Sequence, residues 1–336
     1  MAVPQQRAEN PAPAAPSEGL LADIEARAAE MAREAGAILA GHFGRGKLKV
    51  EFKDEKQRDP VTNADKECQE LLEGAIAKHF PDHGVLGEEG EDKKAEESPA
   101  PDFVWVLDPL DGTKNFMGGL PVYASSVGVM YRGVPIVGAV FVPWPSDGGG
   151  VVLHARTGGG AFADDEPISV AEFEEPKGNS LVTLPGSFGA AYRFRKPMNG
   201  KVGEVRVTGS IAYELAMTAR GVLQYAVTTG PHLWDVAGGV VLVAEAGGLI
   251  MRRRRSDRLG GLIHETRWEP MNSFVSTWDS SVPAMKELRR WSASMVLGSP
   301  GVVRNVTSNL RPRTLLRHRL RRAVRAWRGK RGPTAH

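Results

Sequence analysis

The sequence is poor in cysteine, with a single one, Cys68, among 336 residues. One cysteine excludes an intrachain disulfide and any zinc site built from cysteines, and it is typical of the reducing cytoplasm, where we expect the protein to lie. No apolar run is long enough to span a bilayer, and the Pro- and Ala-rich start lacks the basic and apolar regions of a secretory signal. We therefore expect a disordered lead over residues 1–18.

Negative charge is missing from the C-terminal end, because residues 301–336 contain eleven Lys and Arg and no Asp or Glu. The whole chain carries +3, so residues 1–300 carry −8. An acidic body excludes a general positive field as the source of phosphate affinity, which must then come from metal ions and local dipoles. Hydrophobic residues make up 41% and charged residues 25%, as is usual for a globular protein with a sizeable core.

Hydrophobic spacing predicts two long helices in the first part of the chain. They cover residues 20–43 and from 59 to about 80, and Asp65 lies in the first turn of the second helix. Apolar segments then predict successive antiparallel strands, and the second half alternates strands with helices. The strands are expected at 123–130, 136–142 and 151–155, and the later helices at 211–220 and 235–246.

One short segment concentrates groups that bind metals and phosphate. It reads Trp105-Val-Leu-Asp108-Pro-Leu-Asp111-Gly112-Thr113. The apolar run predicts a buried strand that ends at Pro109 and places Asp108 at its carboxyl end. Asp108 and Asp111 supply the oxygen ligands that magnesium prefers, and a helix opening at Gly112 and Thr113 would offer free N–H groups to a phosphate. The alternative is an Asp-Pro turn whose carboxylates only cap a helix.

Three further segments contain acidic residues that could join Asp108 and Asp111. They are Asp59-Pro-Val-Thr-Asn-Ala-Asp65, Gly87-Glu88-Glu89 and Trp234-Asp235-Val-Ala-Gly-Gly. With these four segments, the chain over about residues 20–292 resembles the inositol monophosphatase family of magnesium-dependent phosphatases. The resemblance implies an α+β / α/β fold, a layered αβαβα sandwich of the inositol monophosphatase and fructose-1,6-bisphosphatase type. It implies a phosphatase domain over 19–295, with halves at about 19–170 and 171–295, a homodimer, and sensitivity to lithium.

The resemblance also implies which residues hold magnesium. Glu88, Asp108 and the backbone carbonyl of Leu110 would bind one ion, and Asp108, Asp111 and Asp235 a second. Some members recruit another ion near Glu88, so two or three Mg²⁺ ions are expected. Paired ions stabilise both the entering and the leaving oxygen of a displaced phosphoryl group. The alternative for Asp235 is an ordinary cap at the start of a helix.

The remaining site residues are assigned by the same resemblance. Thr113 would position the attacking water and Asp65 would accept a hydrogen bond from the threonine hydroxyl, with Glu88 completing the catalytic set. The alternatives are a threonine that only starts a helix and an aspartate that only balances the helix dipole, an effect of about 0.3–1 kcal/mol. Contacts to substrate and phosphate are expected from Gly112, Thr113, Gly209, Ser210, Ile211 and Thr228.

The substrate is the least determined part of this prediction. Inositol-preferring members carry an acidic residue seven positions before the last metal-binding aspartate, and that position is Thr228 here. An uncharged side chain removes a strong hydroxyl acceptor, which disfavours myo-inositol phosphate but leaves the phosphate chemistry unchanged. The expected function is Mg²⁺-dependent hydrolysis of a small-molecule phosphate monoester. The alternatives are a 3′(2′),5′-bisphosphate nucleotide, fructose 1,6-bisphosphate or histidinol phosphate as substrate, or a regulatory RNA- or membrane-binding role on this fold.

The last part of the chain, residues 296–336, is expected to be a basic tail. Leucine, valine and tryptophan recur at helical spacing over 314–328, with arginines on the remaining positions. This pattern predicts an amphipathic helix that could contact an anionic membrane, nucleic acid or an acidic protein, and the alternative is a disordered, solvated tail.

Overall fold

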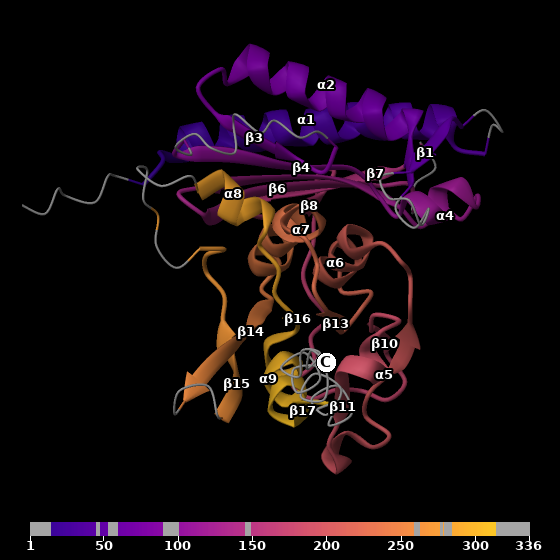
Figure 1. Cartoon of the computed structure of the whole chain (residues 1–336), viewed down its shortest axis with the longest axis vertical. Helices are drawn as coiled ribbons and strands as arrows, with labels where there is room; N and C mark the ends of the chain where they lie inside the picture. The colour runs from indigo at the N-terminus through magenta and orange to yellow at the C-terminus, as the bar shows by residue number, and fades with distance from the viewer. Residues whose placement is uncertain are drawn as a thin grey trace, which may run out of the picture.

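Two large sheets alternate with helices in this chain, which is described here from a computed structural model. The structure describes residues 15–44, 48–52, 60–89, 101–144, 149–258, 263–275, 278 and 284–313. Figure 1 shows α1 and α2 outside the first sheet, α6 and α7 between the sheets, and α9 beyond the second sheet. The layers follow the predicted αβαβα order.

The first sheet has seven strands in the order of the chain, and only its first pair, β3 and β4, is parallel. Helices α1 (Glu18–His42) and α2 (Asn63–His79) cover one face with buried apolar side chains. The strands are β3 (Gly84–Gly87), β4 (Phe103–Asp111), β5 (Ala124–Tyr131), β6 (Val134–Val142), β7 (Val151–Arg156), β8 (Gly160–Ala163) and β9 (Glu166–Pro167). The three antiparallel strands expected after residue 123 are therefore confirmed.

Helix α7 packs closely against the other face of this sheet because two strand glycines give it room. A side chain at Gly128 would place its Cβ 2.6 Å from the Cβ of Ala237, and one at Gly138 would overlap the backbone of Gly238. Such contacts are too short for any other residue. The glycines bring the start of α7 next to the end of β4 and the start of β5.

The second sheet has six strands in the order β12-β10-β13-β16-β14-β15. They are β12 (Glu204–Arg206), β10 (Leu181–Thr183), β13 (Tyr225–Thr228), β16 (Met295–Gly298), β14 (Leu249–Arg258) and β15 (Ile263–Pro270). Its helices are α6 (Ile211–Ala219), α7 (Leu233–Glu245), α8 (Ala284–Arg289) and α9 (Pro300–Asn309). Smaller elements are β1 (Val50–Phe52) paired with β2 (Pro60–Thr62), α4 (Thr113–Met117), α5 (Phe188–Ala191), the 3-10 helix η1 (Lys196–Met198), and β11 (Tyr192–Phe194) paired with β17 (Leu310–Pro312).

The boundary predicted between a body ending at 295 and a tail starting at 296 is wrong. Strand β16 lies between β13 and β14 with all its residues buried, and α9 and β17 continue the same half. The apolar run that begins at Met295 is short and is followed by the arginine-rich end of the chain, so composition alone assigns it to the tail. The body reaches at least Arg313, and the helix predicted over 314–328 lies outside the described residues.

Two smaller predictions also need correction. Strand β4 does not end at Pro109 but continues to Asp111, with its register to β5 shifted between Asp108 and Asp111. A bulge tolerates proline because it removes the need for a ladder N–H there. Helix α1 begins at Glu18, inside the predicted lead, because the Ser17 hydroxyl caps it. In the part of the chain that the structure describes, we find no helix with the length and apolarity needed to cross a membrane.

A buried ion pair ties α1 to β7. Glu25 is 5% exposed and accepts hydrogen bonds from His154 Nδ1 and Arg156 Nη1, both at 2.7 Å. His154 Nε2 faces the Asp164 carbonyl at 2.9 Å, so both ring nitrogens face acceptors and the imidazolium form is favoured. The bond to Glu25 raises the pKa of His154 above 6.5, although burial acts against this.

We predict that this pair makes folding stability depend on pH. The folded pKa of His154 exceeds its unfolded value, so its contribution is complete below pH 6.5 and is lost as the pH rises through the folded pKa. His154→Asn should flatten the fall in urea-unfolding free energy between pH 6 and 9. Glu25→Gln should cost about 2 kcal/mol, because the half-buried His154 and Arg156 lose the carboxylate that they share. Glu30→Gln, in an exposed pair with Arg27, is the control and should change little. An unchanged pH dependence in His154→Asn would contradict the assignment.

Candidate metal and phosphate site

Four acidic residues from three elements meet where the first sheet faces α7, and we call them the carboxylate cluster. They are Glu88, Asp108, Asp111 and Asp235. Parallel strands end at the same edge, and the Glu88 N–H donates to the Leu107 carbonyl at 3.0 Å, so β3 and β4 deliver their carboxylates side by side. Asp235 comes from the first turn of α7. The predicted segments are thus brought together.

Asp108 is the buried centre of the carboxylate cluster, at 1% exposure, whereas the other three members are half-buried. Its Oδ1 accepts from the Leu110 N–H at 3.1 Å across the bulge. Its Oδ2 is buried and receives no hydrogen bond from the described residues, and the Glu88 carboxylate lies close enough to raise its pKa. A buried acceptor facing another carboxylate requires a proton or a cation.

Asp111 links the end of β4 to the start of α6. Its Oδ2 accepts from the Ser210 hydroxyl at 2.9 Å and from the Ala212 N–H at 2.5 Å. Ser210 also caps α6 through the Tyr213 N–H. These bonds hold one carboxylate oxygen and leave the other to the carboxylate cluster.

The pKa values of the three aspartates in the cluster rise because the aspartates are buried and the cluster's charges repel one another. Burial raises the pKa of Asp108 well above 3.8, and the charges of Glu88, Asp111 and Asp235 raise it further. Burial also raises the pKa of Asp111 well above 3.8, with the charge of Asp235 next in effect. Burial raises the pKa of Asp235 to about 7 against a 2.8 Å hydrogen bond from the His232 N–H. A divalent cation would reverse these shifts, so the donor set fits hard metal ions.

The side chains of the carboxylate cluster are not yet arranged as the ligands of a bound ion. In the described part of the chain, no three His, Cys, Asp or Glu side chains converge as ligands of one ion. Asp111 and Asp235 each use Oδ2 for a hydrogen bond at a helix start, which leaves one oxygen of each for a cation. The Leu110 carbonyl, predicted as a ligand, accepts the Thr113 hydroxyl at 3.1 Å.

Asp65 and Thr113 lie together beside this cluster. Thr113 Oγ1 is 3.4 Å from Asp65 Oδ1, and Asp65 Oδ2 accepts both the N–H and the hydroxyl of Thr62, at 2.8 and 2.5 Å. Asp65 therefore completes a capping box for α2 with one oxygen and faces Thr113 with the other. Burial raises the pKa of Asp65 to about 6, and the charge of Glu88 adds to the rise.

The backbone segments expected to bind phosphate, at the starts of α4 and α6, lie beside Asp111. Gly112 has φ of 92° and starts α4, and a Cβ there would lie 3.0 Å from the Val122 carbonyl and from Ser210 Cβ. Gly209, at φ of 80°, precedes the cap of α6, and Ile211 is its first residue. Glycine is needed at 112 both for its backbone conformation and for space.

Thr228 has no contact that joins it to the carboxylate cluster in the described residues. It ends β13, is 1% exposed, and its hydroxyl has no hydrogen-bond partner among the described residues. The chain runs from it to the start of α7 and Asp235. Thr228 thus lies at the end of β13, a short loop before Asp235 in the chain, and its role in substrate binding stays a prediction.

Two residues that were not predicted, Asn115 and Thr62, also hold the site together. Asn115 Nδ2 donates to the Thr208 and Val122 carbonyls, both at 2.7 Å, and so ties α4 to the loop before α6. Thr62 anchors Asp65. The spacing of Thr62 and Asp65 is that of a capping box, a signal present in the sequence, whereas the partners of Asn115 are distant in the chain.

Comparison with known proteins gives a consistent result. The chain matches the inositol monophosphatase family over residues 21–278. It is 33% identical over 225 residues to the fructose-1,6-bisphosphatase/inositol-1-monophosphatase of Aquifex aeolicus, covering 64% of this chain and 80% of that protein. It is 30% identical over 227 residues to the histidinol-phosphatase of Chlorobaculum parvum, covering 66% and 82%. Among solved structures, an IMPase of Thermotoga maritima superposes with a TM-score of 0.61 at 27% identity, covering 85% of this chain and 95% of that one.

We predict that Asp108→Asn has opposite effects on stability without and with Mg²⁺, because it removes both a repelling charge and a metal ligand. Without divalent ions the variant should be more stable than the parent protein by about 1 kcal/mol, because a buried like charge is removed. Mg²⁺ at a hundred times its dissociation constant should stabilise the parent by about 2.7 kcal/mol and the variant by much less. Thermal unfolding with and without Mg²⁺ measures both effects. Exposed Glu70→Gln is the control, and equal Mg²⁺ stabilisation of Asp108→Asn and the parent would exclude Asp108 as a ligand.

Proposed function

The chain belongs to the inositol monophosphatase family and is a phosphoric monoester hydrolase, and we propose that it acts on a small phosphorylated metabolite with Mg²⁺ as its metal. The observation that carries this proposal is the carboxylate cluster, whose buried centre, Asp108, has an oxygen without a hydrogen-bond donor in the described residues. Four mutually repelling carboxylates at a strand end favour hard cations.

The proposed ligands follow from the positions of the side chains. Glu88, Asp108, Asp111, Asp235 and the Leu110 carbonyl would hold two or three Mg²⁺ ions. Magnesium, when bound, supplies positive charge that stabilises the phosphoryl oxygens and makes water more acidic. Lithium inhibition is expected with this arrangement by resemblance to the family.

The chain's own groups orient the water that attacks phosphorus. If the Thr113 hydroxyl donates to Asp65 Oδ1, now at 3.4 Å, its lone pair is free to accept a hydrogen bond from water. In the alternative orientation the hydroxyl donates to the Leu110 carbonyl at 3.1 Å. A bound ion that engages this carbonyl would favour the first orientation. Thr62 keeps Asp65 in place through two hydrogen bonds to its other oxygen.

We predict that Thr113→Val lowers kcat by about 10²–10⁴, the usual contribution of a positioned proton-transfer group, because it keeps the shape but removes the hydroxyl. Thr113→Ser is the matched control and should keep most of the activity. Phosphate release at saturating Mg²⁺ measures both variants. Equal activity of the valine and serine variants would remove Thr113 from the mechanism.

We propose a substrate other than, or broader than, myo-inositol phosphate. Thr228 replaces the acidic residue of inositol-preferring members and has a buried hydroxyl with no partner in the described residues. Relatives at similar identity are named for fructose 1,6-bisphosphate, inositol phosphate and histidinol phosphate, so overall similarity does not choose among these. A panel of these three with a 3′(2′),5′-bisphosphate nucleotide tests the choice.

We predict that Thr228→Glu raises kcat/KM for inositol 1-phosphate by about tenfold, since a hydrogen bond to a charged group contributes about 1.5–3 kcal/mol. Thr228→Gln is the control, because it has the same size without the charge. Thermal unfolding shows whether each variant is folded. A folded Thr228→Glu variant with no gain over Thr228→Gln would show that this position does not select the substrate.

A further inference from the structure

A two-stranded ribbon of β11 and β17 lies at the end of the molecule opposite α1 and α2 (Figure 1). The two strands run antiparallel, with Arg193 directly opposite Arg311. The pairing extends by one residue at each end, because the N–H groups of Arg195 and Arg313 donate to carbonyls across the ribbon at 3.0 and 2.9 Å. Strand β17 lies after residue 278, where the match to the family ends, so the family match does not account for the ribbon.

The two faces of this ribbon differ in chemical character. Tyr192, Phe194 and Leu310 face the core of the second half, where they pack with valines of α9. Side chains alternate along a strand, so the residues between these apolar ones face outward. The outward residues include four exposed arginines, which we call the arginine face: Arg193, Arg195, Arg311 and Arg313.

The arginine face has no counter-charge in the part of the chain that the structure describes. None of its four guanidinium groups forms an ion pair with a described carboxylate, and Arg311 Nη1 only donates to the Leu310 carbonyl at 3.1 Å. The sequence contains no Asp or Glu over 176–203 or 288–336. Like charges directly opposite one another on paired strands are destabilising. An anion lying across Arg193 and Arg311 would remove this repulsion.

The distribution of charge along the chain favours a large anion at this end of the molecule. Residues 1–300 carry −8 in total, so most of the body repels anions. Lys196 is exposed next to the arginine face, and residues 314–336, which follow it directly in sequence, contain eight Lys and Arg and no Asp or Glu. Their like charge excludes residues 314–336 as the cover of the arginine face. The occupant must therefore come from outside the chain.

Two properties of the arginine face favour duplex DNA over a membrane or a single strand. In β11 and β17, as the structure describes them, no large apolar or aromatic side chain is highly exposed. The face thus offers nothing to insert into lipid and no ring on which unpaired bases could stack. A surface of cations alone gains most from the densest anion, and duplex DNA carries one charge per about 1.7 Å of axis against one per about 3.4 Å for each strand.

We infer that the arginine face binds the phosphate backbone of duplex DNA without reading its sequence. Arginine presents a planar fork of donors that matches a phosphate group. Arg193 and Arg195 are about 6.8 Å apart along β11, the length of about two steps along one DNA strand. Contacts to phosphates alone carry no sequence information. The inference concerns binding and does not rest on the proposed substrate or metal.

Fluorescence anisotropy of a labelled DNA duplex of about 20 base pairs, titrated with the full chain at several KCl concentrations, tests this inference. The double variant Arg193→Gln/Arg311→Gln should weaken binding at least tenfold at low salt. It should also reduce the slope of log affinity against log salt by about 1.8, since each phosphate contact contributes about 0.9. Lys78→Gln/Arg290→Gln is the matched control, because it removes two exposed positive charges from α2 and from the end of α8, and it should change the slope much less.

Circular dichroism shows whether each variant is folded. No binding of the wild-type chain to the duplex at low salt would overturn the inference. Equal affinities and slopes for the arginine variant and its control would also overturn it, because DNA would then bind elsewhere on the chain.

Two further probes test the choice of partner, namely a single-stranded RNA of the same length and vesicles that contain anionic lipid. We expect both to bind more weakly than the duplex at the same salt concentration. Tighter binding of either probe, reduced in the arginine variant but not in the control, would exclude duplex DNA as the partner of the arginine face.

Discussion

Repulsion among four carboxylates at one strand end is the constraint on which the arrangement of this protein depends. Glu88, Asp108, Asp111 and Asp235 are held together although burial and mutual charge raise the pKa values of all three aspartates. The fold maintains this contact by strong packing elsewhere, above all where Gly128 lets α7 approach the sheet. The repulsion among the carboxylates destabilises the fold locally, and the packing of α7 on the sheet compensates for it. A site that is to bind cations requires this balance.

Three carboxylates of the site serve the local structure and the site at the same time. Asp65, Asp111 and Asp235 each use one oxygen to accept N–H groups at the start of a helix. The second oxygen of each remains for another partner. The choice between a capping residue and a functional one is therefore not a real alternative here, because a carboxylate has two oxygens and both roles orient it in the same way.

Local patterns predicted most elements and the pair Asp108 and Asp111, because helix spacing, strand alternation and the Asp-Pro-Leu-Asp segment are short-range signals. Glu88 and Asp235 were assigned by the family resemblance, since neither stands in a specific local pattern. The predicted end of β4 at Pro109 was wrong because a bulge, which depends on pairing with β5, lets the strand continue to Asp111. Strand β16 was missed because its place between β13 and β14 depends on long-range pairing. The bond from Ser210 to Asp111 joins residues 99 apart, and no local signal announces it.

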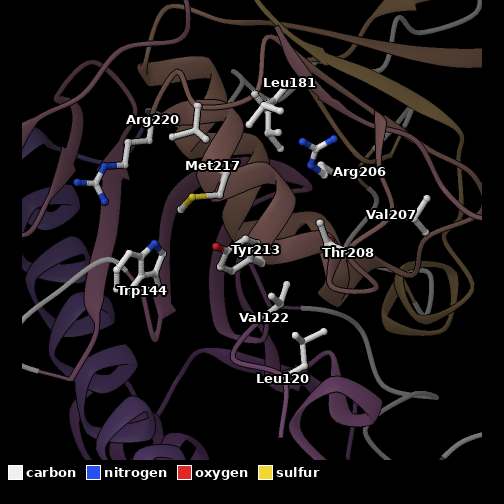
Figure 2. A pocket seen from close by; sticks show the side chains of 12 residues that line it. Leu120, Val122, Trp144, Leu181, Arg206, Val207, Thr208, Tyr213, Met217 and Arg220 are labelled. Carbon is white, nitrogen blue, oxygen red and sulfur yellow. The ribbon is translucent and has the colours of Figure 1, made fainter. Parts of the chain in front are cut away.

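One loop connects the carboxylate cluster to an apolar groove beside α6, which Val207, Thr208 and Tyr213 help to line (Figure 2). Thr208 follows β12 and Val207, accepts from Asn115 through its carbonyl, and stands two residues before Ser210, which donates to Asp111. The same few residues thus border the apolar groove on one side and position a cluster carboxylate on the other.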